Sequence, residues 1–395
     1  MGRWRWKYIT LLLLVSSSVW MNMVGKLSGV TITGPSGPAV GAAAPAVPAI
    51  YVFGDSTADV GTNNYVRRCG AKANFPHFGI DYPGSKPTGR FSNGYNSVDF
   101  LAQYLGFKES PPPYMYFVTY DKRNFARNVL NGTNFASGGS GLLDITGKGP
   151  YKKVVPFSEQ VRQFGTIRKA YKKILGGVAA QKRLSYSLFL ISVGSNDLFE
   201  HFILNFTRQS DPKLQQAFIN SLLTSYENHL RTLLKLGAKR LGVVSLGPIG
   251  CCPILRAKNK IGNGQCFEAV NQYARAFNLG IEALLHKLSS DKSLHMKYTI
   301  TKSFDMTLSL INNPISSSSG FKNTKSACCG GGGDLNAENA CSPKSVVCED
   351  RNSFLFWDQF HPTEAAYKLA AMALYGGGKQ HVHPINIGQL AALKF

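Results

Sequence analysis

The chain has 395 residues and a formal net charge of +22, because 44 lysines and arginines stand against 22 aspartates and glutamates. Hydrophobic residues make up 44% and charged residues 17%, a composition that argues against a disordered chain and against a polytopic membrane protein. The positive charge predicts attraction to an anionic polysaccharide or an acidic membrane surface. Basic residues occur only in scattered pairs such as Arg67-Arg68, without an arginine-rich tract or zinc-finger spacing, so nucleic acid is not an expected partner.

The N-terminus has the pattern of a signal peptide. A basic R-W-R-W-K start precedes an apolar stretch from Tyr8 to Val24, and its unbroken part is shorter than the ~20 residues that span a bilayer. We therefore expect residues 1–26 to be a signal peptide, with the cleavage point open as far as residue 48. Residues 27–48, rich in proline, glycine and alanine, form the expected leader, and an uncleaved membrane anchor is the alternative.

The cysteines fit an oxidising compartment. Five of the eight cysteines fall late in the chain, at Cys266, Cys328, Cys329, Cys341 and Cys348. In a secreted protein such cysteines form disulfides, and their pairing is left open. The adjacent pairs are not C-x-x-C motifs and have no histidine at ligand spacing, so no metal site is expected. N-x-T sequons at Asn131 and Asn205 predict glycosylation in the secretory route.

From Ala49 onward, short apolar runs alternate with long amphipathic segments. The runs at 49–53, 188–193, 240–246 and 296–301 are the expected strands, and the segments at 97–105, 157–175, 211–236, 266–288 and 362–374 are the expected helices. This alternation predicts an α/β fold, a three-layer α/β/α sandwich with a mostly parallel sheet. One domain over residues 49–395 accounts for it.

Small and polar residues stand directly after the expected strands. Ser56 follows the first strand in F-G-D-S, Asn196 follows the strand at 188–193 in G-S-N-D, and Gly139 lies in a glycine-rich stretch at 134–141. Open parallel sheets bind ligands at the carboxyl ends of their strands, so we expect these residues at the functional site. Each has a simpler alternative, Ser56 as a helix N-cap and the other two as turn residues.

Asp358 and His361 form a further candidate pair in the motif D-Q-F-H-P. The proline restricts His361 to extended backbone, so His361 ends a loop and Pro362 opens the last helix. Asp358 can then approach one imidazole nitrogen while the other faces a hydroxyl, as acyl transfer requires. The alternative is an ordinary pair of surface residues.

These four motifs occur in the order of the signature blocks of the GDSL or SGNH hydrolases, and the chain resembles the plant branch of that family. The resemblance continues through D-V-G-T-N-N-Y at 59–65, P-T-G-R-F-S-N-G at 87–94, L-G-P-I-G-C at 246–251 and A-C-C-G at 327–330. It covers the chain from Ile50 to the C-terminus. One departure is Thr57, where the family's motif has leucine, and we expect it to change the packing beneath the nucleophile.

The resemblance implies a flavodoxin-like sheet and roles for individual residues. Ser56 would be the nucleophile and donate its backbone N–H to the oxyanion. Gly139 would add a second backbone N–H and Asn196 a side-chain amide, while His361 would be the base and Asp358 its orienting partner. The chain lacks the G-x-S-x-G motif of the common α/β-hydrolases.

The implied activity is hydrolysis of carboxylic esters, including lipid acyl esters, through an acyl-enzyme and without a metal or cofactor. The implied location is extracellular, in the cell wall or apoplast. Two alternatives remain open at this point. One is acyl transfer or polysaccharide deacetylation by the same triad, and the other is a non-catalytic protein that binds cell wall or lipid.

Overall fold

The computed structural model describes residues 44–204, 212–259, 263–313 and 319–394. The expected signal peptide, most of the leader and the sequon residue Asn205 lie outside these ranges. Asn131, the other sequon residue, is exposed immediately before a strand. Within the described residues, no helix is both long enough and apolar enough to cross a bilayer.

The central sheet of the described residues has six strands in the spatial order β10-β5-β4-β3-β1-β2. The strands are β1 Ile50–Gly54, β2 Gly132–Asn134, β3 Leu188–Ser192, β4 Arg240–Val244, β5 Lys297–Thr301 and β10 Val382–Pro384. Every neighbouring pair is parallel except β10 and β5 at one edge. The parallel order 2-1-3-4-5 is that of the flavodoxin-like sheet, so the expected architecture is confirmed.

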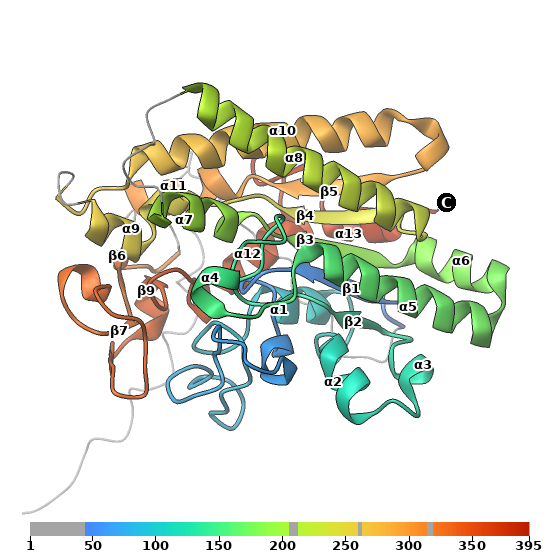
Figure 1. Cartoon of the computed structure of the whole chain (residues 1–395), viewed down its shortest axis with the longest axis horizontal. Coiled ribbons are helices and arrows are strands. Elements are labelled where there is room, and N and C mark those ends of the chain that lie inside the picture. The colour runs from blue at the N-terminus through green and yellow to red at the C-terminus, as the bar shows by residue number, and fades with distance from the viewer. Residues whose placement is uncertain (1–43, 205–211, 260–262, 314–318, 395) are drawn as a thin grey trace, which may run out of the picture. The chain divides into compact units, whose positions relative to one another are not determined.

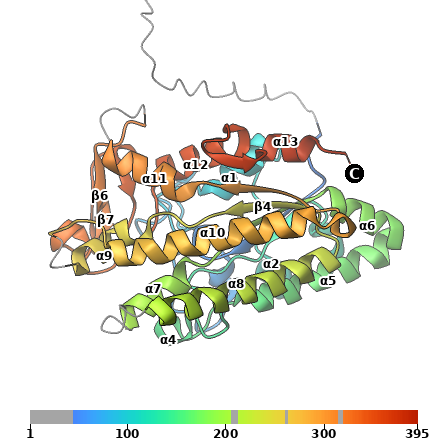
Figure 2. The same cartoon turned by 90° about the horizontal axis from the view of Figure 1, so that it is seen from above.

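Helices cover both faces of this sheet, and Figure 2 shows the three layers from above. One layer contains α5, α6, α8 and α10, and the other contains α1, α12 and α13. The helices of the described residues are α1 Ser97–Tyr104, α2 Tyr114–Tyr120, α3 Phe125–Asn128, α4 Lys148–Tyr151, α5 Phe157–Leu175, α6 Gly177–Tyr186, α7 Ser195–Leu204, α8 Pro212–Lys235, α9 Pro253–Lys258, α10 Glu268–Ser290, α11 Ser303–Asn312, α12 Glu364–Gly376 and α13 Ile387–Ala392.

The apolar side chains of β1 pack alternately on the two faces of the sheet. Tyr51 and Phe53 belong to the core under the α5 and α10 layer, whereas Ile50 and Val52 belong to the core under α1 and α13. A strand that is buried on both faces has no polar positions, which explains its continuous apolar run.

The helix α5 follows from the spacing of its apolar residues. Phe157, Val161, Phe164 and Ile167 recur every three or four positions and are all buried. The helix ends at Gly176, whose φ of 79° and ψ of 164° form an extended conformation that favours glycine. These signals place α5 at the expected bounds, and the other expected strands and helices end within two residues of theirs.

One expectation about the C-terminal helix is wrong. Pro362 does not open it, because α12 begins at Glu364, and α13 follows as a further helix. Pro362 instead forms an isolated antiparallel bridge with Phe356. The N-cap of α12 is Thr363, whose hydroxyl accepts the N–H of Ala366.

The chain is already packed at the end of the expected leader. The backbone N–H of Ala46 donates to the carbonyl of Leu105, and Val47 is only 1% exposed. The folded unit therefore includes residues that composition placed in the leader.

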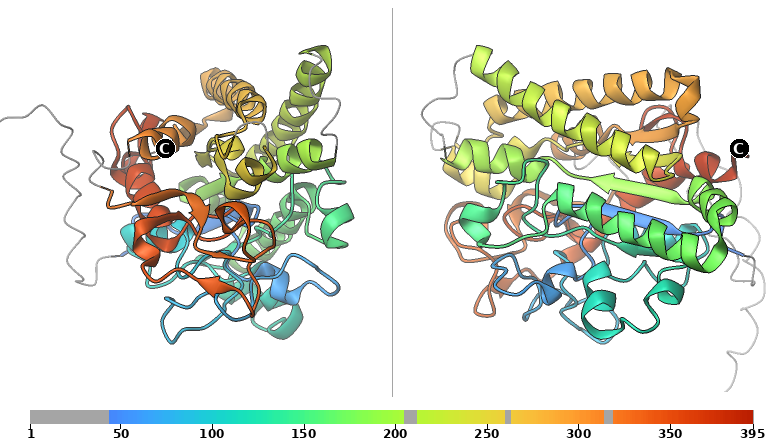
Figure 3. Two further views of the ribbon diagram at one scale, coloured as in Figure 1. Left: turned by 90° about the vertical axis from the view of Figure 1, so that its left-hand side faces the viewer. Right: turned by 45° about the vertical axis from the view of Figure 1, so that its right-hand side comes forward.

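Two small sheets lie beside the carboxyl ends of the parallel strands, at the left in Figure 1 and facing the viewer in the left view of Figure 3. They pair β6 Asn323–Ala327 with β9 Phe354–Phe356, and β7 Cys329–Gly330 with β8 Val346–Val347. Disulfides Cys328–Cys348, Cys329–Cys341 and Cys251–Cys266 are formed, while Cys69 and Cys252 are buried thiols. The small sheets thus carry two cross-links beside the edge where the site was expected.

Candidate active site

The turn after β1 brings Ser56 to the carboxyl end of the sheet. Gly54 ends the strand at φ 141°, and a Cβ at this position would lie 1.9 Å from the carbonyl oxygen of Ser192 on β3. Only glycine therefore lets the ends of β1 and β3 approach this closely. Ser56 follows two residues later, is 7% exposed, and lines a cavity.

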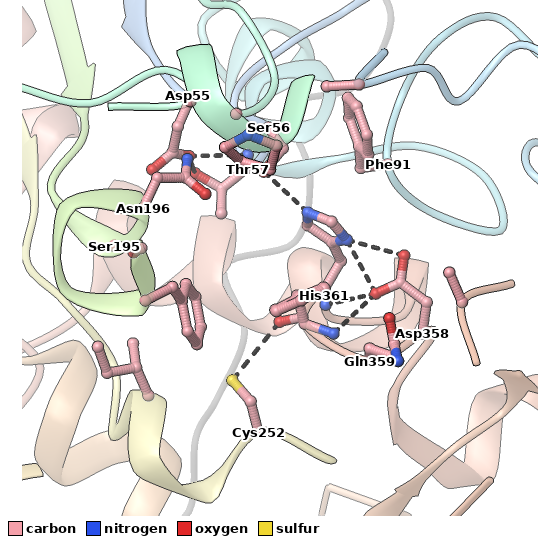
Figure 4. A pocket seen from close by; sticks show the side chains of 18 of the residues that line it. Asp55, Ser56, Thr57, Phe91, Ser195, Asn196, Cys252, Asp358, Gln359 and His361 are labelled. Atoms are coloured by element: carbon pink, nitrogen blue, oxygen red, sulfur yellow. Dashed lines mark hydrogen bonds and ion pairs between the residues drawn. The ribbon is translucent and has the colours of Figure 1, made fainter. Parts of the chain in front are cut away.

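Asp358 and His361 lie in the turn between β9 and α12, and their side chains meet. The imidazole Nδ1 is 2.8 Å from each carboxylate oxygen of Asp358. On the other side of the ring, Nε2 is 2.8 Å from the hydroxyl oxygen of Ser56. Figure 4 shows the resulting line from carboxylate through imidazole to hydroxyl. This is the geometry of a serine, its base and the group that orients the base.

The turn that carries the histidine is held by backbone and ring contacts. Oδ1 of Asp358 also accepts the backbone N–H groups of Phe360 and His361, at 2.9 and 2.8 Å. The N–H of Trp357, a fully buried residue, donates to the carbonyl of His361 at 2.7 Å. The ring of Phe91 packs against the imidazole with 5.0 Å between ring centroids. These contacts leave the imidazole little freedom to turn away from Ser56.

Gly139 and Asn196 line the same cavity as Ser56 and His361. Gly139 has φ 81°, and a Cβ there would lie 2.5 Å from the ring of Tyr151, so a side chain is excluded. Asn196, in the first turn of α7, donates from Nδ2 to the carbonyl of Ser140 at 2.9 Å. That bond uses one of the two amide hydrogens. Figure 4 shows Ser56 between His361 on one side and Asn196 on the other.

Two backbone N–H groups of the cavity are free to bind a ligand. Among the described residues, neither the N–H of Ser56 nor that of Gly139 donates to a protein acceptor. A free backbone N–H in a buried site is costly unless a ligand accepts it. The five residues expected at the site, Ser56, Gly139, Asn196, Asp358 and His361, therefore share one cavity with unused donors.

The cavity has a volume of about 670 Å³ and an apolar wall. Its aromatic and aliphatic lining includes Phe75, Phe78, Phe91, Tyr151, Phe199, Ile203, Ile249, Phe356 and Phe360. Such a site, with a few polar groups in an apolar cleft, is typical of small-molecule binding. No group of three or more His, Cys, Asp or Glu side chains in the described ranges is placed to hold a metal ion.

Residues 50–374 match the family described as GDSL-like lipase/acylhydrolase. The chain belongs to this family. Two GDSL esterase/lipases of Arabidopsis thaliana are each 36% identical to it over 88% of the chain and over 90% and 92% of their own lengths. GDSL esterase/lipase 6 of the same plant is 33% identical over 88% of the chain and 91% of its own length. This GDSL lipase/acylhydrolase is a carboxylic ester hydrolase.

The GDSL motif of this chain ends in Thr57, whose hydroxyl replaces a leucine side chain. Its Oγ1 donates to Oδ1 of Asp55 at 2.7 Å and lies 2.8 Å from the hydroxyl of Ser192. Burial raises the pKa of Asp55, and the hydrogen bonds from Thr57 act against that rise. The substitution places polar contacts, rather than apolar packing, beside Ser56.

Two residues that position the Gly139 loop had no role in the sequence interpretation. Oδ2 of Asp59 accepts the N–H of Gly138 at 2.9 Å, and Nδ2 of Asn63 donates to the carbonyl of Gly138 at 2.9 Å. Both residues lie in the D-V-G-T-N-N-Y stretch that carries part of the family resemblance. The resemblance therefore marked the stretch, but it did not predict that these two side chains contact Gly138. Burial raises the pKa of Asp59 to about 6.

Asp197 and Gln160 are two further buried polar residues for which the sequence predicted no role. Asp197 accepts the N–H groups of Leu142 and Leu143 and the hydroxyl of Thr146, and so fixes the segment after Gly139. Burial raises its pKa to about 6. Asp197 follows Asn196 in the G-S-N-D motif, whereas Gln160 lies in no recognised motif.

Proposed function

We propose that this GDSL hydrolase cleaves carboxylic esters through an acyl-enzyme on Ser56. The single observation that carries the proposal is the 2.8 Å contact from His361 Nε2 to the hydroxyl oxygen of Ser56, with Asp358 on the other imidazole nitrogen. His361 accepts the hydroxyl proton as the oxygen attacks the ester carbonyl. The imidazolium then protonates the leaving alcohol, which departs as the C–O bond breaks.

The second half of the cycle returns the enzyme to its starting state. Water enters after the alcohol leaves, and His361 takes a proton from it as the oxygen attacks the acyl carbonyl. The imidazolium returns that proton to the Ser56 oxygen, and the carboxylic acid is released. Asp358 keeps the imidazole oriented and stabilises its charge in both halves. The cycle uses no cofactor.

The negative charge on the carbonyl oxygen needs donors that are in place before the reaction. In this proposal they are the N–H groups of Ser56 and Gly139 and the free amide hydrogen of Asn196. One such donor contributes about 2.7 to 4 kcal/mol to transition-state stabilisation in other oxyanion holes. Support comes from the unused N–H groups and from the shared cavity.

The apolar cavity wall supports a lipid-like acyl group as part of the substrate. About 670 Å³ lies in the size range of pockets that bury a whole small ligand. An extended hydrocarbon chain would gain about 0.8 kcal/mol for each buried methylene. A panel of p-nitrophenyl esters from acetyl to palmitoyl measures this gain, and rising kcat/KM with chain length is the expected result.

We propose further that the protein is secreted and acts in the cell wall or apoplast. The N-terminal pattern, the three disulfides and the exposed sequon at Asn131 support this route. Because Val47 is buried in the domain, we place the start of the mature domain before Ala46, with residues 1–26 as signal peptide. Loss of residues 1–26 removes four basic residues and no acidic residue, so the formal net charge falls from +22 to +18 and still favours retention on an anionic polysaccharide or membrane surface.

The test is replacement of Ser56 by alanine, assayed with a short-chain aryl ester and a fluorophosphonate probe. The proposal expects loss of nearly all turnover and loss of covalent labelling. Wild-type-like hydrolysis by the alanine variant overturns it. Adding a polyol acceptor to the wild-type assay separates hydrolysis from acyl transfer, because a transferase forms acylated polyol in place of free acid.

A further inference from the structure

Gln160 occupies the centre of a hydrogen-bond network beneath the nucleophile turn. It lies near the start of α5, and its side chain is fully buried. Its Oε1 accepts the N–H of Gly54 at 2.8 Å, and its Nε2 donates to the carbonyl of the same glycine at 2.9 Å. One side chain therefore pairs with both polar backbone groups of the residue that ends β1, two positions before Ser56.

The same amide contacts the segment that carries Gly139. Its Nε2 is 3.2 Å from the hydroxyl of Ser140 and 2.9 Å from the carbonyl of Val155. The hydroxyl of Ser140 donates to the carbonyl of Gly54 at 2.9 Å. The carbonyl of Ser140 accepts the amide of Asn196 at 2.9 Å. The segments that carry Ser56, Gly139 and Asn196 thus meet in one buried network around Gln160.

We propose that Gln160 is a positioning residue that sets the spacing of the three oxyanion donors. The proposal rests on the donor roles assigned above to Ser56, Gly139 and Asn196. Gln160 does not line the catalytic cavity, so it acts through Gly54 and Ser140. Donors stabilise the developing charge only when they are held in place, and a displacement of about 1 Å costs about 10²-fold in rate.

The chemistry of the side chain matches this task. An amide offers an acceptor and a donor in one plane, which matches the N–H and the carbonyl of Gly54, and the carbonyl also accepts the N–H of Ser137 at 3.0 Å. A hydrocarbon side chain of similar size fills the space but leaves the buried N–H of Gly54 without its acceptor. The turn then has to shift toward another partner, and Ser56 shifts with it.

Gln163 provides a matched control on the same helix. It lies one turn after Gln160, is buried at 6% exposure, and has the same size. Its Nε2 contacts Glu159 at 3.2 Å and the sulfur of Met115 at 3.8 Å, without touching the network. A substitution of Gln163 therefore reports the general cost of changing a buried glutamine in α5.

The experiment compares Gln160→Met with Gln163→Met in the full chain. We expect kcat for an aryl ester to fall about 10²-fold in Gln160→Met, while KM changes less than about 2-fold. An arylboronic acid, which forms a tetrahedral adduct with the nucleophile, should bind Gln160→Met more weakly by a similar factor. Gln163→Met should keep both constants. A loss of global stability alone lowers the amount of folded enzyme. It does not raise the dissociation constant of the boronate for the enzyme that remains folded.

A second variant keeps the test decisive if Gln160→Met does not fold. Ser140→Ala deletes only the hydroxyl that joins Gln160 to the Gly139 segment, and we expect it to lower kcat and boronate affinity together, by about 10-fold. Where both variants fold, the double variant should lose less kcat than the product of the two single losses, because both substitutions break the same network.

The outcomes separate this inference from the proposed function. If Ser56→Ala retains wild-type turnover, the proposed function fails and Gln160 has no oxyanion donors to position. If Ser56→Ala is inactive while Gln160→Met keeps wild-type kcat and boronate affinity, only the role of Gln160 is overturned. Unchanged constants in Ser140→Ala overturn it equally.

Discussion

The carboxylate of Asp358 contacts His361 at both its ring and its backbone. The ring Nδ1 lies 2.8 Å from each carboxylate oxygen, and the backbone N–H of the histidine donates to Oδ1 at 2.8 Å. One side chain therefore fixes the rotation of the imidazole and the position of its backbone. The opposite nitrogen is left facing Ser56.

The first prediction concerns this carboxylate. Replacing Asp358 by asparagine keeps the size of the side chain but presents an amide to Nδ1, which favours the wrong imidazole tautomer. We expect kcat to fall by about 10⁴-fold, by analogy with a serine protease triad. Steady-state kinetics measure the loss, and circular dichroism checks the fold. Asp350→Asn, at an exposed position nearby, is the control, and a loss below about 10-fold in Asp358→Asn contradicts the prediction.

The second prediction concerns Thr57. Thr57→Val keeps the β-branched shape but removes the hydroxyl that contacts Asp55 and Ser192. We expect a loss of about 1–3 kcal/mol in the free energy of unfolding, because the buried carboxyl group of Asp55 and the half-buried hydroxyl of Ser192 each lose a partner. The triad contacts are untouched, so kcat should change less than about 5-fold. Urea denaturation gives the stability, and Thr57→Ser should retain it. Equal stability of the valine and serine variants refutes the assigned contact.

The third prediction concerns pH and Asp197. Its pKa is raised by burial from 3.8 to about 6, so between these values the folded state holds a proton that the unfolded state has released. The contribution of this group to the free energy of unfolding therefore falls as pH rises from about 4 to about 6. In Asp197→Asn this contribution is absent. The free energy of unfolding should therefore decline less steeply between pH 4 and 6 than in the wild type, by up to about 1.4 kcal/mol per pH unit.

Urea denaturation at several pH values between 4 and 6 measures this slope. Asp334→Asn, an exposed position in the same chain, should leave the slope of the wild type unchanged. A slope in Asp197→Asn equal to that of the wild type shows that the carboxyl does not titrate in this window. The slope, rather than the stability at one pH, is the quantity to compare, because asparagine also lacks one of the carboxylate acceptors.

The fourth prediction concerns acyl length. Cys252 is a buried thiol in the cavity wall, with its sulfur 3.6 Å from the carbonyl of Phe360. Cys252→Phe fills part of the space that a long acyl chain would occupy. We expect kcat/KM for a palmitoyl ester to fall about 10-fold more than for an acetyl ester, since each misplaced methylene costs binding. Cys69→Ala, a buried thiol outside this cavity, is the control. Parallel losses for both esters would place the acyl chain elsewhere.

Much of the fold could be predicted because its signals are local. The apolar runs of β1, β3, β4 and β5 and the three- and four-residue spacing of α5 lie within short windows. The strand β2, Gly132–Asn134, has only three residues and no apolar run, so its place at the sheet edge depends on pairing with β1. The small sheets around the disulfides depend in the same way on distant partners.

In the candidate site, too, contacts between residues close in sequence could be predicted and contacts between distant residues could not. Asp358 and His361 are three residues apart, so their contact follows from one turn. Asp197 and Gln160 act through contacts with partners 51 to 55 and up to 106 positions away, and no local pattern marks a glutamine for such a contact. The hydroxyl of Thr57 also finds Ser192 at a distance of 135 positions. Motif order predicted the candidate catalytic residues, while the contacts that hold their segments in place required the tertiary structure.

The hydrogen bond between Ser56 and His361 joins positions 305 residues apart. A chain still being synthesised contains Ser56 long before His361 exists, and a refolding chain must bring β1 and the turn before α12 together before this hydrogen bond can form. Contacts of such sequence separation are slow to form because the entropic cost of loop closure has to be met first. Under the proposed mechanism, ester hydrolysis begins only after the two ends of the domain have docked, so the onset of activity reports the final stage of folding.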